Sequence, residues 1–404
     1  MQTLHSCTYD SFHIGAYIKH GLPLYLYDYL SNSLEKNPDS STGEKRDHHP
    51  ATAETRPNRP SVFIILMGAL GDVARGLCLV SHIKNHWPHC RVTWLIETKW
   101  VDVVSCHPGI DHVIVFDRPR GVRAVWSLRK QLAAEHFDIT LDLQRHLKSG
   151  FFSFLSGARR RVGFHPKNAK EFNWLFNTEY IEYSGSGVPK IDLYLRFTRR
   201  LKLPPPQHLD FGFSTLDLHT LRPDISARVT TPYLAVVMGS SWKSKDWILE
   251  GYAKLVSDIL ADGKMGVVLL GDRSQAAQAE RLTGMIKDAA LVNLVDKTSL
   301  IELVAVLKTA AVAVGPDSGP GHLSGSVDTP YVSLFGPTDP SIAAPYGSEH
   351  LVVRVNVDCG PCYKRKCPTP EKWCMRKIDV DVVKKKIYHA LSQQHQGCLF
   401  QGVR

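Results

Sequence analysis

The stretch that decides the fold is GPDSGPGHLSGSVDTPYVSLFGPTDP, residues 315–340. It begins at the end of one apolar run, AAVAVG, and contains a second, YVSLF, so we expect a buried strand, a helix and another buried strand. Asp317, Ser318 and Gly319 then fall where the first strand meets the helix, and His322 lies one turn later. Glycine beside Asp and Ser at a helix start favours close approach of a phosphate. A structural turn with a hydrogen-bonded histidine is the alternative.

The same alternation of strands and helices extends through most of the chain. Residues 232–392 contain the apolar runs YLAVVM, MGVVLLG and LVNLVD, and residues 61–210 contain SVFIILMG, RVTWLI, HVIVFD and DITLDL. Strands that alternate with helical patterns predict parallel sheets, whose ligands bind at the carboxyl ends of the strands. We therefore predict an α/β protein of two Rossmann-like doubly wound domains facing a cleft, joined by a linker at 211–231.

The two ends of the chain have a different character. Residues 1–60 combine an aromatic patch, LPLYLYDYL, with a long polar run, which predicts a largely disordered N-terminal extension. The patch could instead form a short amphipathic helix on a membrane or on the protein. Residues 393–404 are predicted to be a C-terminal tail. The first residues lack the pattern of a cleavable signal peptide, so we expect a reducing, cytoplasmic location.

The charge balance indicates anionic partners. The 404 residues include 49 Lys and Arg against 39 Asp and Glu, a formal charge of +10. Nucleic acid, a phosphorylated sugar and an acidic membrane surface all fit such a charge. Because the sequence has neither an RNA-binding aromatic signature nor zinc-finger spacing, we expect no nucleic-acid partner.

Two further loops follow predicted strands. In MGALGDVARG, residues 67–76, Asp72 lies at the start of a helix and is expected to face the cleft; a helix N-cap is the alternative. In MGSSWKSKDW, Ser240, Ser241 and Lys245 offer hydroxyls and a cation that suit a phosphate. An ordinary serine-rich loop with a solvated lysine is the alternative there. All three loops are predicted to meet at one cleft.

Four of the nine cysteines form a cluster with the spacing C-x2-C-x4-C-x6-C, namely Cys359, Cys362, Cys367 and Cys374. Four soft ligands this close together suit a structural zinc, and free thiols packed in a long loop are the alternative. No pair of carboxylates with metal-ligand spacing lies near the three loops, so we expect no catalytic metal and no required cofactor.

Basic residues follow the predicted strand DITLDL. Arg145 and Lys148 lie in DLQRHLKSG, and Arg159 to Arg161 follow in GARRRVGF. Such residues can bind an acceptor that carries carboxylates or phosphates, although a solvated basic face is the alternative for each. Together with the net charge they favour an acidic glycolipid at a membrane surface.

These motifs resemble those of the glycosyltransferase family nine heptosyltransferases, which build the inner core of bacterial lipopolysaccharide. The resemblance covers about residues 61–392, through LGD, the loop KSKDW, the stretch quoted first and CGPCYKRKCPTPEKWCMRKIDVDVV. It implies a glycosyltransferase-B fold, with the acceptor bound mainly by the first domain and the nucleotide sugar by the second. It also implies a last helix that crosses back to the first domain.

The resemblance also implies roles for individual residues. Asp72 matches the family's candidate general base, and Lys245 matches its cation for the donor diphosphate. The turn from Asp317 to Gly319 matches the cradle for donor sugar and phosphate. His322 matches a family histidine that either orients this turn or touches the donor.

The implied activity is an inverting transfer of heptose from ADP-heptose to the inner core of lipopolysaccharide, at the inner face of the cytoplasmic membrane. Related transferases often have a glutamate that can accept the ribose hydroxyls, but here the sequence is GDRSQ, with Asp272 or Gln275 as substitutes. The alternatives are therefore another nucleotide-sugar donor or another acceptor, a nonenzymatic nucleotide-sugar-binding protein, and a regulatory module built on the cysteine cluster. An epimerase of related fold is disfavoured by the pairing of DSGPGH with FGPTDP.

Overall fold

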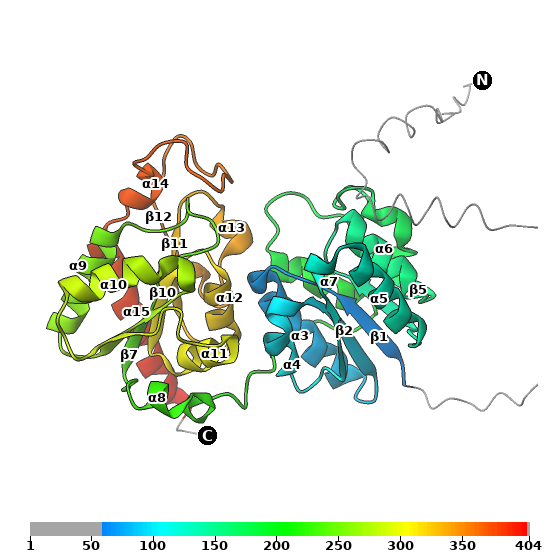
Figure 1. Ribbon diagram of the computed structural model, residues 1–404, viewed down its shortest axis with the longest axis horizontal. Helices are drawn as coiled ribbons and strands as arrows, with labels where there is room; N and C mark the ends of the chain where they lie inside the picture. The colour runs from blue at the N-terminus through cyan, green and yellow to red at the C-terminus, as the bar shows by residue number, and fades with distance from the viewer. Residues whose placement is uncertain (1–58, 402–404) are drawn as a thin grey trace, which may run out of the picture.

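The computed structural model describes residues 59–401, which form two α/β units side by side (Figure 1). The predicted N-terminal extension, apart from its last two residues, lies outside the described part of the chain. Among the described helices, none is both long enough and apolar enough to cross a membrane.

The first unit is built on a six-stranded sheet with the order β3-β2-β1-β4-β5-β6, in which every pair is parallel. Its strands are β1 Ser61–Ile65, β2 Arg91–Glu97, β3 His112–Phe116, β4 Ile139–Asp142, β5 Arg160–Gly163 and β6 Glu179–Tyr180. Its helices are α3 Leu70–His86, α4 Val101–Ser105, α5 Val122–Ala133, α6 Leu147–Leu155 and α7 Lys190–Arg200, with the 3-10 turn η3 Asn173–Phe176. The strands predicted from RVTWLI, HVIVFD and DITLDL are confirmed.

The second unit repeats this plan with the parallel order β12-β11-β10-β7-β8-β9. Its strands are β7 Tyr233–Val237, β8 Gly266–Leu270, β9 Leu291–Asn293, β10 Val312–Pro316, β11 Tyr331–Phe335 and β12 Val353–Arg354. Its helices are α9 Leu249–Ala261, α10 Ala276–Met285, α11 Leu300–Thr309, α12 Gly319–Ser326, α13 Pro340–Ala343, α14 Trp373–Arg376 and α15 Val380–Gln401. The strand, helix and strand expected from the opening stretch are β10, α12 and β11.

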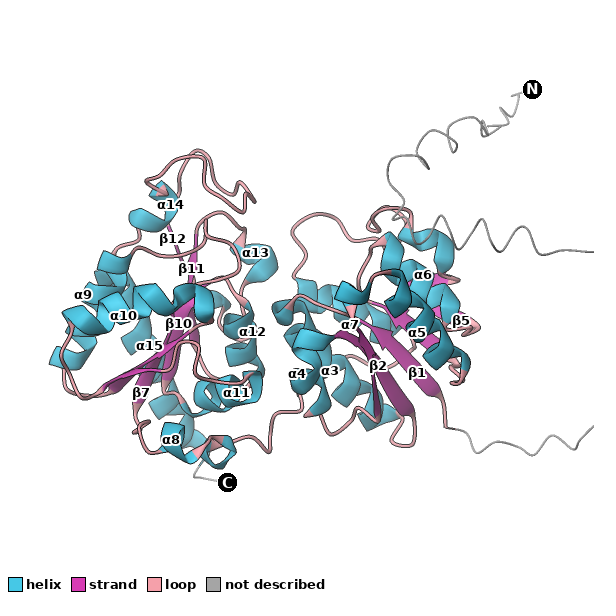
Figure 2. Cartoon of the chain, viewed as in Figure 1, coloured by secondary structure: helices cyan, strands magenta, loops and turns pink. Residues whose placement is uncertain are grey.

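Helices cover both faces of each sheet (Figure 2). In the first unit α5 and α6 pack on one face, and α3, α4 and α7 pack on the other. In the second unit α11 and α12 pack on one face of the sheet, and α9, α10 and α15 pack on the other. One buried apolar cluster runs from α3 in the first unit to α11 and α12 in the second, so the two units meet through these helices (Figure 1).

Two glycines allow this close approach of α3 and α12. A Cβ atom on Gly71 would lie 2.5 Å from the ring of His322, and one on Gly319 would lie 2.9 Å from Leu70. Contacts this short are incompatible with any larger residue unless the backbone moves. Glycine in the LGD and DSG motifs thus serves the packing of the two domains, a reason that the sequence does not reveal.

The C-terminal region differs from expectation in two ways. Helix α15 runs to Gln401, so the predicted tail at 393–404 is helical over most of its length. Val383 and Ile387 of α15 belong to the core of the second unit, so the expected return to the first unit is wrong for this part of the helix. Helix α15 remains on the second unit because its apolar side chains pack beside α9 in the core of that unit.

The segment between the two units is also packed against the body. It contains the short helix α8 Pro223–Ser226, and Phe211, Phe213 and Leu221 are buried in the cluster that joins the two units. These apolar side chains fix the path of the chain between β6 and β7.

Candidate active site

Asp72 lies in the first turn of α3, directly after β1. Its Oδ1 accepts hydrogen bonds from Nη2 of Arg75 at 2.6 Å and from Nζ of Lys190 at 2.7 Å. The N-cap of α3 is Ala69, and no side chain caps this end, so the alternative reading of Asp72 as an N-cap is wrong. The carboxylate is held instead by a cation one helical turn away and by another that is distant in sequence.

The two cations control the ionisation of Asp72. Burial by itself raises the pKa of this carboxyl group, but the charges and hydrogen bonds of Lys190 and Arg75 outweigh it and hold the pKa well below the usual range. Asp72 is therefore an ionised carboxylate at neutral pH, with its basicity reduced by its partners.

A polar cavity of about 200 Å³ opens beside Asp72 in the first unit. Its walls include the polar and charged side chains of Gln144, Arg145, His146, Lys170, Lys190 and Tyr194. Arg145, predicted from the sequence as an acceptor-binding residue, therefore lines the same cavity as Asp72. Lys148 does not line this cavity: its Nζ lies 3.9 Å from Oε1 of Glu97 and 4.9 Å from the centre of the Phe116 ring.

The loop after β10 forms a second charged centre. Asp317 is 6% exposed, and its Oδ2 accepts hydrogen bonds from Nζ of Lys245 at 2.6 Å and from Oγ1 of Thr338 at 2.7 Å. Thr338 belongs to FGPTDP, so this hydrogen bond explains why that motif accompanies PDSG. Ser318 is the N-cap residue of α12, and Gly319 is its first residue.

His322 connects the two centres across the domain interface. Nη1 of Arg75 lies 2.9 Å from Nδ1 and 2.5 Å from Nε2 of this histidine, and Nε2 lies 3.8 Å from Oδ1 of Asp317. Burial and the neighbouring Arg75 charge lower the pKa of His322 well below its ordinary value, so the ring is neutral at neutral pH. A continuous chain of contacts therefore links Asp72 in the first unit to Lys245 in the second.

The loop after β7 places Lys245 beside aromatic and backbone groups. Nζ of Lys245 lies 4.5 Å from the centre of the Trp242 ring. The backbone amide of Ser240 donates to Asp246 at 3.0 Å, and its hydroxyl bonds within the loop to Trp242. Ser241 is exposed. The structure brings Lys245 to Asp317, whereas Ser240 bonds within its own loop.

The substitutes suggested for the ribose-binding glutamate have local partners. Asp272 accepts from the amide of Ser274, and the carbonyl oxygen of the Gln275 side chain accepts from the amide of Asp272, a capping box at the start of a 3-10 turn. Gln275 is nevertheless close to the loop after β7, because a Cβ atom on Gly239 would lie 2.9 Å from its Cγ.

Three of the clustered cysteines lie in the loop between β12 and α14 and the fourth, Cys374, lies in α14; this region packs on the loop after β7. Ser244 Oγ donates to the carbonyl oxygen of Lys364 at 2.6 Å, and Lys372 Nζ donates to that of Lys243 at 2.9 Å. The four cysteines are free thiols, and among the described residues no three His, Cys, Asp or Glu side chains are arranged as metal ligands. Burial, and to a lesser extent the other three thiols, raise the pKa of Cys374.

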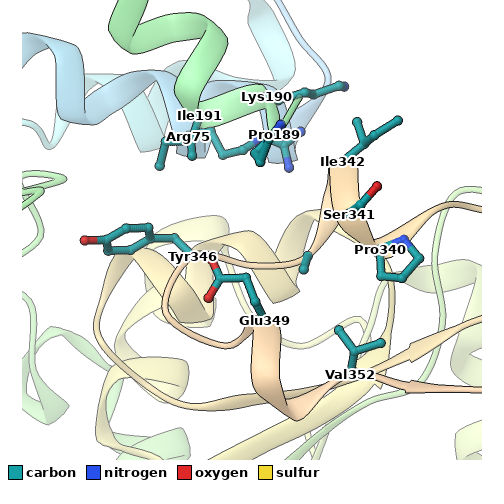
Figure 3. A pocket seen from close by; sticks show the side chains of 11 residues that line it. Arg75, Pro189, Lys190, Ile191, Pro340, Ser341, Ile342, Tyr346, Glu349 and Val352 are labelled. Carbon is teal, nitrogen blue, oxygen red and sulfur yellow. The ribbon is translucent and has the colours of Figure 1, made fainter. Parts of the chain in front are cut away.

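A cavity of about 250 Å³ lies between the two units. Arg75, Pro189, Lys190 and Ile191 line it from the first unit, and residues 340–352 line it from the second (Figure 3). Lys190 borders this cavity and also the cavity beside Asp72. Sequence reasoning missed Arg75, Lys190 and Thr338; the spacing of Arg75 three residues after Asp72 is the one local signal that could have found a partner.

Comparisons with known proteins agree with this architecture. The lipopolysaccharide core heptosyltransferase OpsX of Haemophilus influenzae is 28% identical over 300 residues, which are 73% of this chain and 84% of that protein. Lipopolysaccharide heptosyltransferase 1 of Pseudomonas aeruginosa is 26% identical over 326 residues, 77% of this chain and 89% of that protein. The structure of E. coli heptosyltransferase WaaC with ADP superposes with a TM-score of 0.67 at 23% identity, covering 82% of this chain and 99% of that one.

The fold is thus of the glycosyltransferase-B type, as expected. The sequence pattern of the family described as "Glycosyltransferase family 9 (heptosyltransferase)" matches residues 125–373, which include the loop after β7, residues 315–340 and three of the four clustered cysteines. The chain therefore belongs to glycosyltransferase family 9 and is a glycosyltransferase.

Proposed function

We propose that this enzyme is an inverting heptosyltransferase that moves a heptose from ADP-heptose to the inner core of lipopolysaccharide. The names of the relatives support the substrates. The observation that carries the proposal is that an ionised carboxylate on one domain and a buried cation on the other meet at a single interface. Arg75 and His322 form the contact that joins the two sides.

Asp72 is the proposed general base. The acceptor hydroxyl oxygen attacks C1 of the sugar, the new C1–O bond forms as the bond from C1 to the diphosphate oxygen breaks, and the hydroxyl proton passes to Asp72. General base catalysis of this kind is worth about 10² to 10⁴ in rate. The cavity beside Asp72 supplies room for the acceptor sugar on the first domain.

Lys190 supplies a means of strengthening this base. Its side chain is 32% exposed and borders both cavities, so a carboxylate or phosphate of an anionic acceptor can attract its ammonium group. Once Lys190 turns to the acceptor, Asp72 retains only Arg75 and its pKa rises. The acceptor thereby increases the basicity of the group that deprotonates it.

Lys245 is the proposed cation for the departing diphosphate. Its ammonium is held by Asp317 at 2.6 Å and is only 13% exposed, so it is fixed in place before the donor arrives. Preorganised positive charge stabilises the negative charge that develops as the bond to C1 breaks. The backbone amides at the start of α12, which follows Asp317, are proposed to donate to the same diphosphate.

No metal is assigned a catalytic role in this proposal, because Lys245 and backbone amides supply the positive charge. The four cysteines are the candidate ligands for a structural zinc that would rigidify the loop on which Ser244 packs. Metal analysis of anaerobically purified protein should give either about one zinc per chain, held by the four thiolates in one tetrahedral site, or none, if the cysteines are free thiols packed in the loop. An iron–sulfur absorbance spectrum would contradict both alternatives.

The proposed location is the cytoplasm, with peripheral contact to the inner face of the cytoplasmic membrane, where an anionic glycolipid acceptor lies. Cations near such a surface are each worth about 1 kcal/mol of binding. The formal charge of +10 supports this placement.

The test incubates the full chain with a panel of nucleotide sugars and a lipopolysaccharide core acceptor, followed by mass spectrometry of the product. We expect the acceptor to gain one heptose with ADP-heptose, with inversion at C1, and no gain with the other donors. Transfer from a different donor would change the substrate assignment. Absence of transfer with every donor would contradict the enzymatic proposal itself.

A further inference from the structure

Residues 148–176 of the first domain combine positive charge with exposed apolar side chains. This segment contains six Lys and Arg residues and one acidic residue, Glu171, a balance of +5. It forms α6, β5 and η3, on the part of the first domain remote from the second (Figure 1). Half of the formal charge of the chain is thus concentrated in one short segment.

Three large apolar side chains project from this segment, and we call them the apolar patch: Phe154, Phe172 and Leu175, which are 52%, 60% and 61% exposed. The ring centre of Phe154 lies 6.4 Å from that of Phe176, the last residue of η3, which places α6 and η3 side by side. Glu171 and Phe172 have φ values of 52° and 56°, a left-handed conformation that is rare for bulky residues. The fold therefore maintains an exposed Phe172 in spite of its backbone cost.

One cation lies against the apolar patch, and exposed cations belong to the same segment. The guanidinium of Arg161 lies 5.9 Å from the centre of the Phe154 ring, and Lys167 lies 5.8 Å from that of Tyr183, which is 55% exposed. Arg159 and Lys167 are exposed. Apolar side chains bordered by Lys and Arg are the pattern of a surface that lies on an anionic membrane.

The same segment borders the cavity beside Asp72. Lys170 lines that cavity, and its backbone amide donates to the carbonyl oxygen of Arg145 at 2.8 Å. The amide of Leu147, at the start of α6, donates to Glu171 at 3.2 Å. A lipid-anchored acceptor could therefore keep its acyl chains in a bilayer under the apolar patch while its sugar enters the cavity.

We propose that the apolar patch and the cations of residues 148–176 dock the enzyme on the surface of an anionic phospholipid membrane. A second copy of the chain fits this surface less well, because a two-fold interface would bring the same positive segment face to face with itself. The role of docking in presenting the acceptor rests on the proposed function, whereas membrane binding itself does not.

The first experiment measures co-sedimentation of the full chain with vesicles of phosphatidylethanolamine and phosphatidylglycerol, and with vesicles of phosphatidylcholine alone. The wild-type protein should co-sediment with the anionic vesicles and remain in the supernatant with the neutral ones. The double variant Phe172→Ser/Leu175→Ser should bind at least about tenfold more weakly, since two exposed apolar anchors are lost. Arg159→Gln/Lys167→Gln should weaken binding chiefly at low salt.

Met285→Ser is the matched control, because Met285 is 61% exposed, as Leu175 is, but lies on the second domain. It should bind as the wild-type protein does. Equal binding by the patch variant, or equal binding of the wild-type protein to neutral vesicles, would overturn the proposal. A change from dimer to monomer in the patch variant, measured by light scattering, would assign the surface to a second copy instead.

A second measurement separates this proposal from the proposed function. Transfer is compared between an acceptor embedded in anionic vesicles and the same acceptor after removal of its acyl chains. The patch variant should keep its kcat/KM on the delipidated acceptor and lose about tenfold on the embedded one, in line with its loss of membrane binding. Equal loss on both acceptors would contradict docking, whereas no transfer by any protein, with vesicle binding intact, would contradict only the proposed function.

Discussion

The pair formed by Lys245 and Asp317 offers a test that separates folding from donor binding. Both side chains are buried, 13% and 8% exposed, and lie 2.6 Å apart. Lys245→Met leaves the Asp317 charge with Thr338 as its remaining close donor. Removal of one partner from a buried ion pair costs about 3–5 kcal/mol, and we expect about 3 because Thr338 remains.

A second substitution should restore the fold without restoring the function. In Lys245→Met/Asp317→Asn no buried charge is left unpaired, so the free energy of unfolding should return to within about 1 kcal/mol of the wild-type value. The affinity for ADP-heptose should stay low in both variants. Loss of a charge-assisted hydrogen bond to the diphosphate costs about 1.5–3 kcal/mol, or roughly ten- to a hundredfold in Kd.

Urea unfolding measures the first quantity and titration calorimetry with ADP-heptose the second. Lys243→Met is the control, because Lys243 lies in the same loop but is 58% exposed, with Asp246 at 3.5 Å. This variant should change stability by less than about 1 kcal/mol and leave donor affinity nearly unchanged. If the double variant bound donor as tightly as the wild-type protein, Lys245 would be only the counter-charge of Asp317, and its role toward the diphosphate would be refuted.

Three further predictions follow from the first domain. Asp72→Asn should lower kcat by about 10² or more in single-turnover kinetics while calorimetry shows nearly unchanged donor affinity; near-normal turnover would exclude Asp72 as the base. Lys190→Met should raise the KM for the anionic acceptor about tenfold with little effect on donor Kd, if the ammonium binds an acceptor anion; a change in donor Kd alone would refute this. Burial lowers the pKa of His107 from 6.5 to about 4, so its stabilising contribution is complete above pH 6.5 and is lost as the pH falls toward 4. Urea midpoints should reveal a loss of about 2 kcal/mol between pH 7.5 and 5 that His107→Gln does not share; equal slopes in both proteins would contradict this.

The local sequence pattern was sufficient to predict most of the strands and the α/β fold. Short apolar runs that alternate with helical periodicity predicted the parallel strands. A strand that is buried on both faces consists almost entirely of apolar residues and is therefore visible in the sequence. The short strands β5, β6 and β12 gave no such signal, since two to four residues are too few to show a period. The final helix gave a clear helical pattern, but nothing local tells which domain its apolar face will contact.

Motif spacing likewise located the three loops that meet at the interface, because glycine, aspartate and serine after a strand constrain the local backbone. The residues that contact these loops are distant in the sequence and could not be predicted from the motifs. Lys190 lies 118 residues from Asp72, and His322 lies 247 residues from Arg75. Which cation reaches a carboxylate across such separations depends on how helices α3, α7 and α12 pack, and so does the pKa of that carboxylate. The sequence by itself determined which groups stand at the strand ends, and the tertiary structure decided which of them touch, because hydrogen bonds and close ion pairs require separations of about 3 Å that only the packing of the helices sets.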